Sequence, residues 1–373
     1  MNIEALEKVG DYFKEKELDI ALLSNPATIA WLTGYAPSNQ IGTNPFEGGP
    51  ALGWWHAGKL TLVLSDAEST AAQAQGIETR DYLSYTIESP AAGFLNQGLV
   101  LKNLLKESGN LKGHCGVEFN FLPAALLEII KDSLPLVSLA PLDGSFDQLR
   151  AIKTAREIEL LRASLRICDL AQFETRRLIQ PGISEIELWD RVKCQLDMSA
   201  GCRLPIVADF IAGSRTADIG GLPGEYIIAA GDAVIADIVP RLNGYWGDNA
   251  GTHFASEPSP DLKKMYQIVL NTLKKGIAAI KPGVLACDLD KMLRNAIQDE
   301  GYAPYPHHSG HGLGTSYHEE PRIVPYNQMK IQPGMVIAIE PGIYVPGTGG
   351  VRLEDVVLVT QDGCEVLTKH LGN

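Results

Sequence analysis

Residues 306–355 concentrate side chains that can bind metal ions or move protons. The segment carries half of the chain's eight histidines: His307, His308, His311 and His318. Glu340 interrupts the apolar run MVIAIEPGIYV, and Glu354 and Asp355 interrupt VRLEDVVLVT. A lone buried carboxylate is costly and tends to take up a proton, whereas a carboxylate bound to a cation is not. Each glutamate alone would fit an edge strand that faces water. Two of them beside the histidines favour a metal site.

A second acidic pair lies in AVIADIVPRLNGYWGDNAGTHF. The dipeptide Asn243-Gly244 predicts a two-residue hairpin loop, and the resulting register places Asp237 opposite Ala250. Asp248 and Asp237 then project from the same face as diagonal neighbours, with Cα atoms roughly 7–8 Å apart. A one-residue slip would put them on opposite faces. In the alternative interpretation, Asp248 is a turn residue and Asp237 a chance polar residue. The apolar neighbours of Asp237 favour the ligand interpretation.

These segments resemble the pita-bread metallopeptidase family, which includes methionine aminopeptidase, Xaa-Pro aminopeptidase and Xaa-Pro dipeptidase. The family pattern is matched in order and type at five positions: Asp237, Asp248, His311 in GHGLG, Glu340 in EPGIY and Glu354 in RLED. Residues 1–145 resemble the creatinase-type N-terminal domain that precedes the catalytic domain in part of this family. The resemblance therefore implies an α/β domain over 1–145. It also implies an internally duplicated α+β pita-bread domain with a curved antiparallel sheet over 146–373, and a homodimer.

The resemblance also implies roles for these residues. The five matched side chains become the ligands of two divalent metal ions, and such an oxygen-rich set suits Mn, Co, Zn or Fe. Two ions about 3.5–4 Å apart lower the pKa of a shared water and polarise a scissile carbonyl. Glu340 is then also the candidate general base. The substrate-side residues implied by the resemblance are His307, His318, Tyr344 and Arg352, of which the two histidines are candidate catalytic residues.

Simpler interpretations of the same residues stay open. His307 and His318 would also fit a hydrogen-bonding role behind the metal ligands, and Arg352 would fit a plain ion pair with a carboxylate. The remaining histidines are expected to be structural or on the surface: His56, His114, His253, His308 and His370.

The sequence departs from the family pattern at one substrate-side position and shortly after both aspartates, where Val239 and Ala250-Gly251 replace the usual Gly and Thr-Arg. Active peptidases of this branch usually carry another histidine upstream of the first aspartate, where Gly220 or Gly221 stands here. The leading hypothesis remains a two-metal hydrolase of a C–N bond, either an Xaa-Pro dipeptidase or an Xaa-Pro aminopeptidase. One alternative is a hydrolase of a small non-peptide amide or amidine, since creatine and ectoine hydrolases belong to the same family. Another is a catalytically inactive binding relative.

The periodicity of apolar residues predicts the elements that position the site. Strands alternate with helices before residue 145, which is typical of an α/β layer. TAREIELLRASLRICDLAQFETRRLI predicts one long helix, with Thr154 and Glu157 forming a capping box. A helix–Pro-Gly–helix pattern occurs at Pro181-Gly182 and again at Pro282-Gly283, which hints at the duplication.

Composition limits the partners. The chain has 373 residues, enough for two domains, and a formal net charge of −13, which disfavours nucleic acid and anionic membranes. The N-terminus resembles no signal peptide, and the six cysteines are scattered, so we expect a cytoplasmic protein acting on a small peptide or amide. Trp54, Trp55 and the loop over 36–50 are candidates for reaching across a dimer, with internal packing as the alternative.

Overall fold

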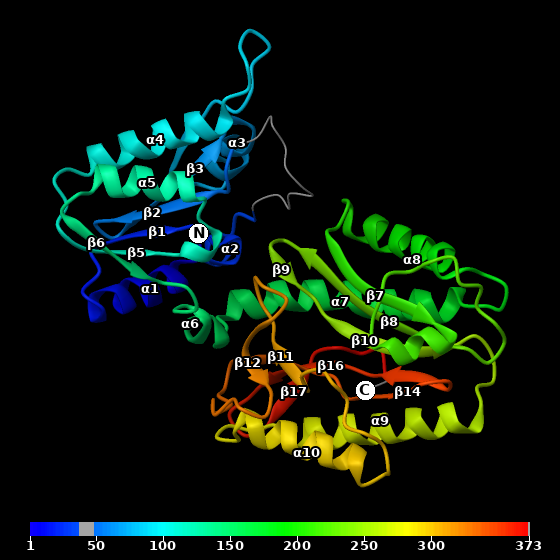
Figure 1. Ribbon diagram of the computed structural model, residues 1–373. Helices are drawn as coiled ribbons and strands as arrows, with labels where there is room; N and C mark the ends of the chain where they lie inside the picture. The colour runs from blue at the N-terminus through cyan, green and yellow to red at the C-terminus, as the bar shows by residue number, and fades with distance from the viewer. Residues whose placement is uncertain (37–47, 372–373) are drawn as a thin grey trace. The chain divides into compact units, whose positions relative to one another are not determined.

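The computed structural model describes residues 1–36 and 48–371, and the chain divides into two compact units, Met1–Leu149 and Arg150–Asn373 (Figure 1). Among the described residues, no helix is long and apolar enough to cross a membrane.

The first unit is a mixed six-stranded sheet with helices on both faces. The strand order is β4-β3-β2-β1-β5-β6. Its strands are β1 (Ile20–Leu23), β2 (Leu52–His56), β3 (Lys59–Ser65), β4 (Thr79–Tyr82), β5 (Gly113–Val117) and β6 (Val137–Pro141). Its helices are α1 (Ile3–Glu15), α2 (Pro26–Thr33), α3 (Asp66–Gln73), α4 (Gly93–Glu107) and α5 (Ala124–Ser133), with α6 (Asp147–Ala151) at the boundary between the units. One core joins α1 and α2 to the sheet, and a second core joins α4 and α5 to its other face.

Both tryptophans considered for a dimer contact pack inside this unit. Trp54 is 2% exposed and belongs to the core beneath α4, whereas Trp55 is 6% exposed and belongs to the core beneath α1. Neighbouring strand residues alternate between faces, so the two rings fill opposite cores. Internal packing therefore accounts for both rings. Most of the loop named with them, residues 37–47, lies outside the described part of the chain.

The second unit is built from antiparallel sheets covered by four helices. The helices are α7 (Ala155–Leu178), α8 (Glu185–Ala200), α9 (Pro260–Ala279) and α10 (Ala286–Gln298). The strands of one sheet are β7 (Ile206–Ala212), β8 (Ala233–Leu242) and β10 (Asn249–Phe254), with β9 (Tyr245–Trp246) paired to β8. A five-stranded sheet, in the order β12-β11-β13-β16-β17, holds β11 (Gly310–Gly312), β12 (Glu319–Ile323), β13 (Val336–Ile339), β16 (Asp355–Val359) and β17 (Cys364–Val366). The remaining pair is β14 (Gly342–Val345) and β15 (Gly349–Arg352).

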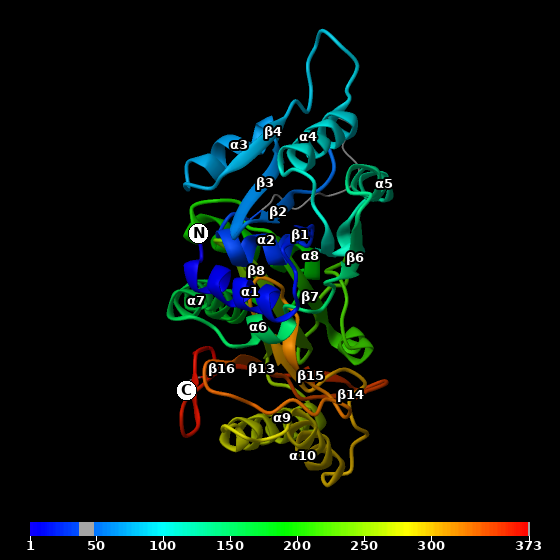
Figure 2. The same cartoon turned by 90° about the vertical axis from the view of Figure 1, so that its left-hand side faces the viewer.

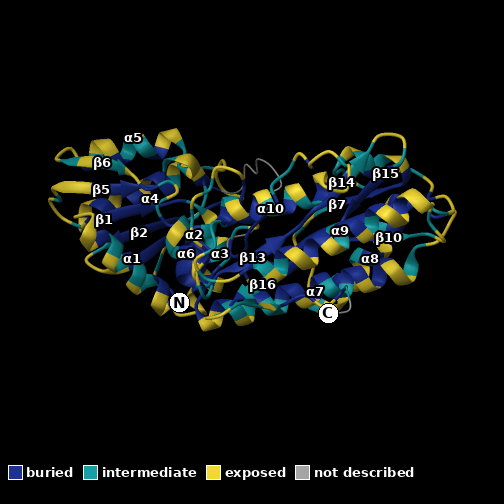
Figure 3. Ribbon diagram, turned by 90° about the horizontal axis from the view of Figure 1, so that it is seen from below, coloured by how far each residue is buried: buried dark blue, intermediate teal, exposed yellow. Residues whose placement is uncertain are grey.

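Each helix pair of this unit covers one half of the sheet layer. α7 and α8 share a core with β7 and β8, and α9 and α10 share a core with β13 and β15 (Figure 2). Most residues of β8, β10, β13 and β16 are buried, while the outward faces of the helices are exposed (Figure 3). The Thr154 hydroxyl accepts a hydrogen bond from the backbone N–H of Glu157, and the Glu157 carboxylate accepts one from the backbone N–H of Thr154. The predicted capping box is therefore present at the start of α7.

The helix–Pro-Gly–helix pattern folds the same way twice. Gly182, between α7 and α8, has a φ of 93° and donates to the carbonyl of Ile228. Gly283, between α9 and α10, has a φ of 92° and donates to the carbonyl of Ile331. Positive φ favours glycine at both turns. Each turn therefore ties a helix pair to the segment that leads into a central strand, β8 or β13.

Candidate metal centre

A β-hairpin positions the two aspartates. Asn243 and Gly244 both have positive φ, at 51° and 84°, as the predicted two-residue loop requires. Asp237, in β8, pairs with Ala250 of β10, so the predicted register is confirmed. Asp248 lies between β9 and β10 and is 4% exposed. The two carboxylates project into one pocket of about 230 Å³.

The other half of the unit supplies the imidazole and the two glutamates. His311 is the central residue of β11, Glu340 directly follows β13, and Glu354 lies between β15 and β16. All three are buried and line the same pocket as the aspartates. Nε2 of His311 is 3.5 Å from Oδ2 of Asp248 and 3.5 Å from Oε1 of Glu340. The structure thus brings together side chains separated by more than a hundred positions in the sequence.

Three of the buried carboxylates favour the protonated form in the metal-free site. Burial raises the pKa of Asp248 and of Glu354 well above their usual values, and the neighbouring carboxylates raise both further. Burial likewise raises the pKa of Asp237 to about 7, although Arg352, with Nη2 at 2.8 Å from Oδ2, opposes that rise. In the absence of a cation, these groups therefore tend to hold protons near neutral pH.

Glu340 differs from the other carboxylates. Burial alone would raise its pKa, but the hydrogen bond from His308 and the adjacent imidazoles bring it down to about 2. Burial lowers the pKa of His307 and of His311, so these rings are uncharged near neutrality. Glu340 therefore remains ionised at neutral pH.

The side chains fit a divalent ion. Asp248, His311 and Glu354 each place one ligand atom so that the three atoms lie within 4.8 Å of one another. Oε1 of Glu354 is buried and receives no hydrogen bond from the described part of the chain. A buried carboxylate oxygen left in this way is unfavourable unless a cation meets it. An oxygen-rich set with one imidazole suits hard or borderline divalent metals.

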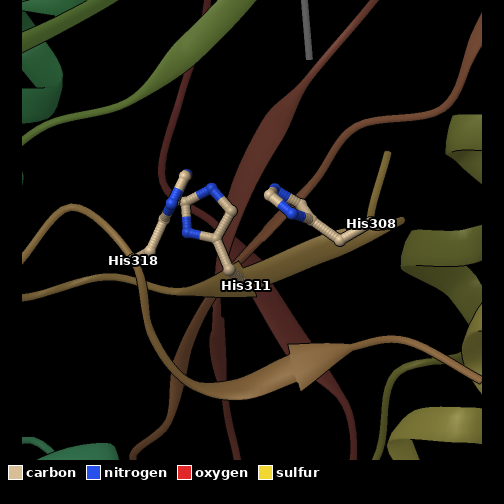
Figure 4. Close-up of side chains that lie close together, drawn as sticks. All are labelled: His308, His311 and His318. Carbon is tan, nitrogen blue, oxygen red and sulfur yellow. The ribbon is translucent and has the colours of Figure 1, made fainter. Parts of the chain in front are cut away.

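His308 is the side chain that the sequence analysis misplaced. It was expected to be structural or on the surface, but its Nε2 lies 2.9 Å from Oε1 of Glu340. Figure 4 shows its ring turned toward His311 and His318, with ring centroids 5.2 Å and 5.0 Å away. One nitrogen from each of the three imidazoles lies within 4.8 Å of the others. The expectation that His308 is structural or on the surface missed this contact, because its position next to His307 gave no spacing signal.

Three of the substrate-side candidates are connected by hydrogen bonds, and two of them, His307 and Arg352, line the pocket. Nε2 of His307 is 2.9 Å from the Tyr344 hydroxyl, which accepts from Nη1 of Arg352 at 3.3 Å. Arg352 is 3% exposed and also meets Asp237. His318 is the most exposed member of the histidine group, and burial lowers its pKa to about 3. These side chains are therefore neutral or cationic donors that face the carboxylates.

Two family models and several known proteins match the chain. A model of metallopeptidase family M24 matches residues 159–361, and a model of the creatinase/prolidase N-terminal domain matches residues 6–152. An Xaa-Pro dipeptidase of Pyrococcus furiosus is 31% identical over 368 residues, covering 98% of each chain. An Xaa-Pro dipeptidase of Pyrococcus horikoshii is 36% identical over 256 residues, covering 68% of this chain and 72% of the relative.

Solved structures confirm the predicted fold class. The prolidase from Pyrococcus horikoshii OT3 superposes with a TM-score of 0.84 at 27% identity, covering 98% of each chain. An Xaa-Pro dipeptidase from Bacillus anthracis superposes with a TM-score of 0.83 at 28% identity, covering 99% of this chain and 98% of the other. The α/β first unit and the pita-bread second unit both follow this architecture.

Proposed function

The chain belongs to metallopeptidase family M24, and from that membership we propose that it is a two-metal peptidase specific for the bond that precedes a proline. It is a metal-dependent peptidase. The proline preference and the number of ions are the parts proposed here. The relatives' names support the former, since they are Xaa-Pro dipeptidases, and the five convergent side chains support the latter.

The proposed ligands of the two ions are Asp237, Asp248, His311, Glu340 and Glu354. The observation that carries this assignment is the cluster of Asp248, His311 and Glu354, whose ligand atoms lie within 4.8 Å of one another. Mn, Co, Zn and Fe all accept such a mixture of carboxylates and imidazole. When bound, the ions supply Lewis acidity toward the scissile carbonyl and toward water.

The chain's own residues handle protons and orientation. Glu340 is the proposed general base, because the family pattern places it beside the attacking water and the neighbouring histidines keep it ionised and able to accept a proton. His318 is the most exposed of these histidines and presents its imidazole to the substrate, and His307, which is bonded to Tyr344, lines the same pocket. Tyr344 and Arg352 hold each other at 3.3 Å and supply fixed donors for the carbonyl or carboxylate oxygens of a peptide.

Turnover of defined peptides tests this function. Metal-free protein would be loaded with Mn or Co and given Gly-Pro, Ala-Pro and Ala-Pro-Xaa, with Gly-Ala as the control without proline. We expect cleavage before proline, with little cleavage of Gly-Ala. Tight metal binding without turnover of any peptide would contradict the proposal and favour a non-peptide amide. The homodimer and the cytoplasmic location predicted from the sequence stay predictions, which light scattering and cell fractionation can test.

A further inference from the structure

Asp209 places one more carboxylate in the peptide pocket. It lies in β7 directly opposite Asp237 of β8, and directly opposed residues share a face of the sheet. Its side chain is 41% exposed, compared with 15% for Asp237, and it lines the pocket. Among the described pocket residues, the other four carboxylates are the proposed metal ligands. Asp209 is therefore the carboxylate available to a substrate.

The contacts of Asp209 within the protein occupy only some of the hydrogen-bond acceptor positions of its carboxylate. Oδ1 accepts the backbone N–H of Gly221 at 2.8 Å, and Oδ2 lies 3.2 Å from Nη2 of Arg352. The same Nη2 lies closer to Asp237, at 2.8 Å, so the guanidinium is shared and compensates Asp209 only in part. A carboxylate offers about four acceptor positions. Asp209 thus retains acceptors and negative charge on its exposed side.

A strained turn packs beside this carboxylate. Ile219 has φ 76° and ψ −56°, and Gly220 donates to the carbonyl of Asp218 at 2.9 Å, which together define a γ-turn of the rare positive-φ kind. Such a conformation is unfavourable for a β-branched residue and persists only where its surroundings hold it. Nη1 of Arg352 donates to the carbonyl of Ile219 at 3.0 Å, and Asp209 holds Gly221. These two hydrogen bonds hold the turn in place, and Ile219 lines the pocket.

Gly220 and Asp209 fit together closely. A Cβ atom at position 220 would lie 2.3 Å from Oδ2 of Asp209, so any side chain there would displace the carboxylate. A Cβ atom at position 221 would lie 3.2 Å from Ile211 and 3.6 Å from Arg215, and would not contact Asp209. Neither Gly220 nor Gly221 has a positive φ, so the backbone conformation itself does not require glycine at either position. The position of Asp209 therefore depends specifically on the lack of a side chain at 220.

We propose that Asp209 is a specificity-determining residue that binds a positively charged side chain of the peptide substrate. The inference rests on the proposed peptidase function and adds the class of peptide. A lysine or arginine side chain next to the scissile bond would form a charge-assisted hydrogen bond with Asp209, which an uncharged side chain of the same size cannot form. Peptides with a basic residue would then be preferred over neutral ones.

Matched peptides and glycine variants test this inference. The pairs Lys-Pro and norleucine-Pro, and Ala-Pro-Lys and Ala-Pro-norleucine, differ in charge at nearly constant size. We expect the wild type to favour the lysine peptide in at least one pair by about fivefold or more in kcat/KM. Asp209→Asn should bring that ratio close to one. Gly220→Ala should do the same by displacing the carboxylate, whereas the matched control Gly221→Ala should keep the wild-type ratio.

Two results would overturn the inference. One is a wild-type ratio within about twofold of unity in both pairs, which is less than a charge-assisted contact provides. The other is a lysine preference that survives in Asp209→Asn. Turnover of the norleucine peptides reports on the proposed function separately, because those peptides carry no side-chain charge. If no peptide is cleaved, calorimetric titration of the same pairs into the metal-loaded protein gives the ratio of Kd values, and the same criteria apply.

Discussion

Nε2 of His308 lies 2.9 Å from Oε1 of Glu340, so an imidazole outside the matched ligand set holds the carboxylate that we assign as general base. This contact comes from the segment just before β11, whereas Glu340 follows β13. Hydrogen bonds to metal-ligating carboxylates orient them and tune the ion that they bind. The position of the segment before β11 therefore affects the orientation of Glu340 and, through it, metal binding and catalysis.

Removing the His308 imidazole should weaken both metal binding and turnover. We expect His308→Leu to lower metal affinity and kcat/KM, each by about 10–100-fold, as loss of such a partner typically does. His308→Gln, which retains an N–H donor, should lose less. His114→Leu, at an exposed position of β5, serves as the control. Metal titration and peptide kinetics that are equal for His308→Leu and the wild type would contradict this assignment.

Glu354→Gln should weaken the stabilisation of the protein by metal without lowering the stability of the metal-free protein. Burial and the neighbouring carboxylates raise the pKa of Glu354, so the metal-free protein holds it as a neutral carboxyl that an amide resembles. We therefore expect the metal-free Tm of the variant to equal or exceed that of the wild type. Metal should stabilise the wild type by about 4 kcal/mol when the free ion is at about 1,000 times Kd, and the variant much less.

Thermal melts with and without a chelator measure this difference. Glu300→Gln, at an exposed position, is the matched control and should respond to metal as the wild type does. A metal-free Tm for Glu354→Gln several degrees below that of the wild type would show that Glu354 serves folding instead.

A buried ion pair at the start of the second unit should matter for stability. Nζ of Lys153 lies 2.5 Å from Oε2 of Glu319, and Nε of Arg150 lies 3.5 Å from its Oε1. Lys153→Met leaves Glu319 with less compensation, and breaking a buried pair costs about 3–5 kcal/mol. Lys153→Met/Glu319→Gln should recover part of that loss. Denaturant titration measures both free energies, and a loss below about 1 kcal/mol for Lys153→Met would refute the expectation.

His253 should make stability depend on pH. Burial lowers the pKa of His253 from 6.5 to about 3, and its Nε2 meets Oε1 of Gln172 at 2.8 Å. The unfolded chain takes up a proton below about pH 6.5 while the folded chain does not. This group's stabilising contribution is therefore complete above that pH and is lost as the pH falls toward 3, by about 1.4 kcal/mol for each pH unit.

The control for this prediction is a histidine that is exposed. His253→Gln should flatten the curve of unfolding free energy against pH between about 6.5 and 4, whereas His114→Gln should leave it unchanged. A wild-type slope that persists in His253→Gln would assign the dependence to other groups.

The hairpin and the start of α7 were predictable because local chemistry fixes them. Asn243-Gly244 dictates a two-residue loop, and the loop sets the register that brings Asp237 toward Asp248. The capping box at Thr154 likewise marks the start of α7. In each case the signal lies within a few residues of the feature that it determines.

His308 and Asp209 could not be identified in this way. His308 stands among other histidines with no spacing that separates it from them. Asp209, in LPIVADFIAG, has the pattern of an ordinary half-exposed strand residue. Its importance depends on the turn at Ile219, and a positive φ at a β-branched residue runs against every local preference. Tertiary contacts with Arg352 impose that turn, so the sequence pattern does not contain it.

Anomalous diffraction from crystals loaded with Mn²⁺ tests the central claim most directly. We expect two anomalous peaks about 3.5–4 Å apart, both enclosed by Asp237, Asp248, His311, Glu340 and Glu354. Peaks elsewhere in the chain, or no peak among these five side chains at saturating Mn²⁺, would contradict the account.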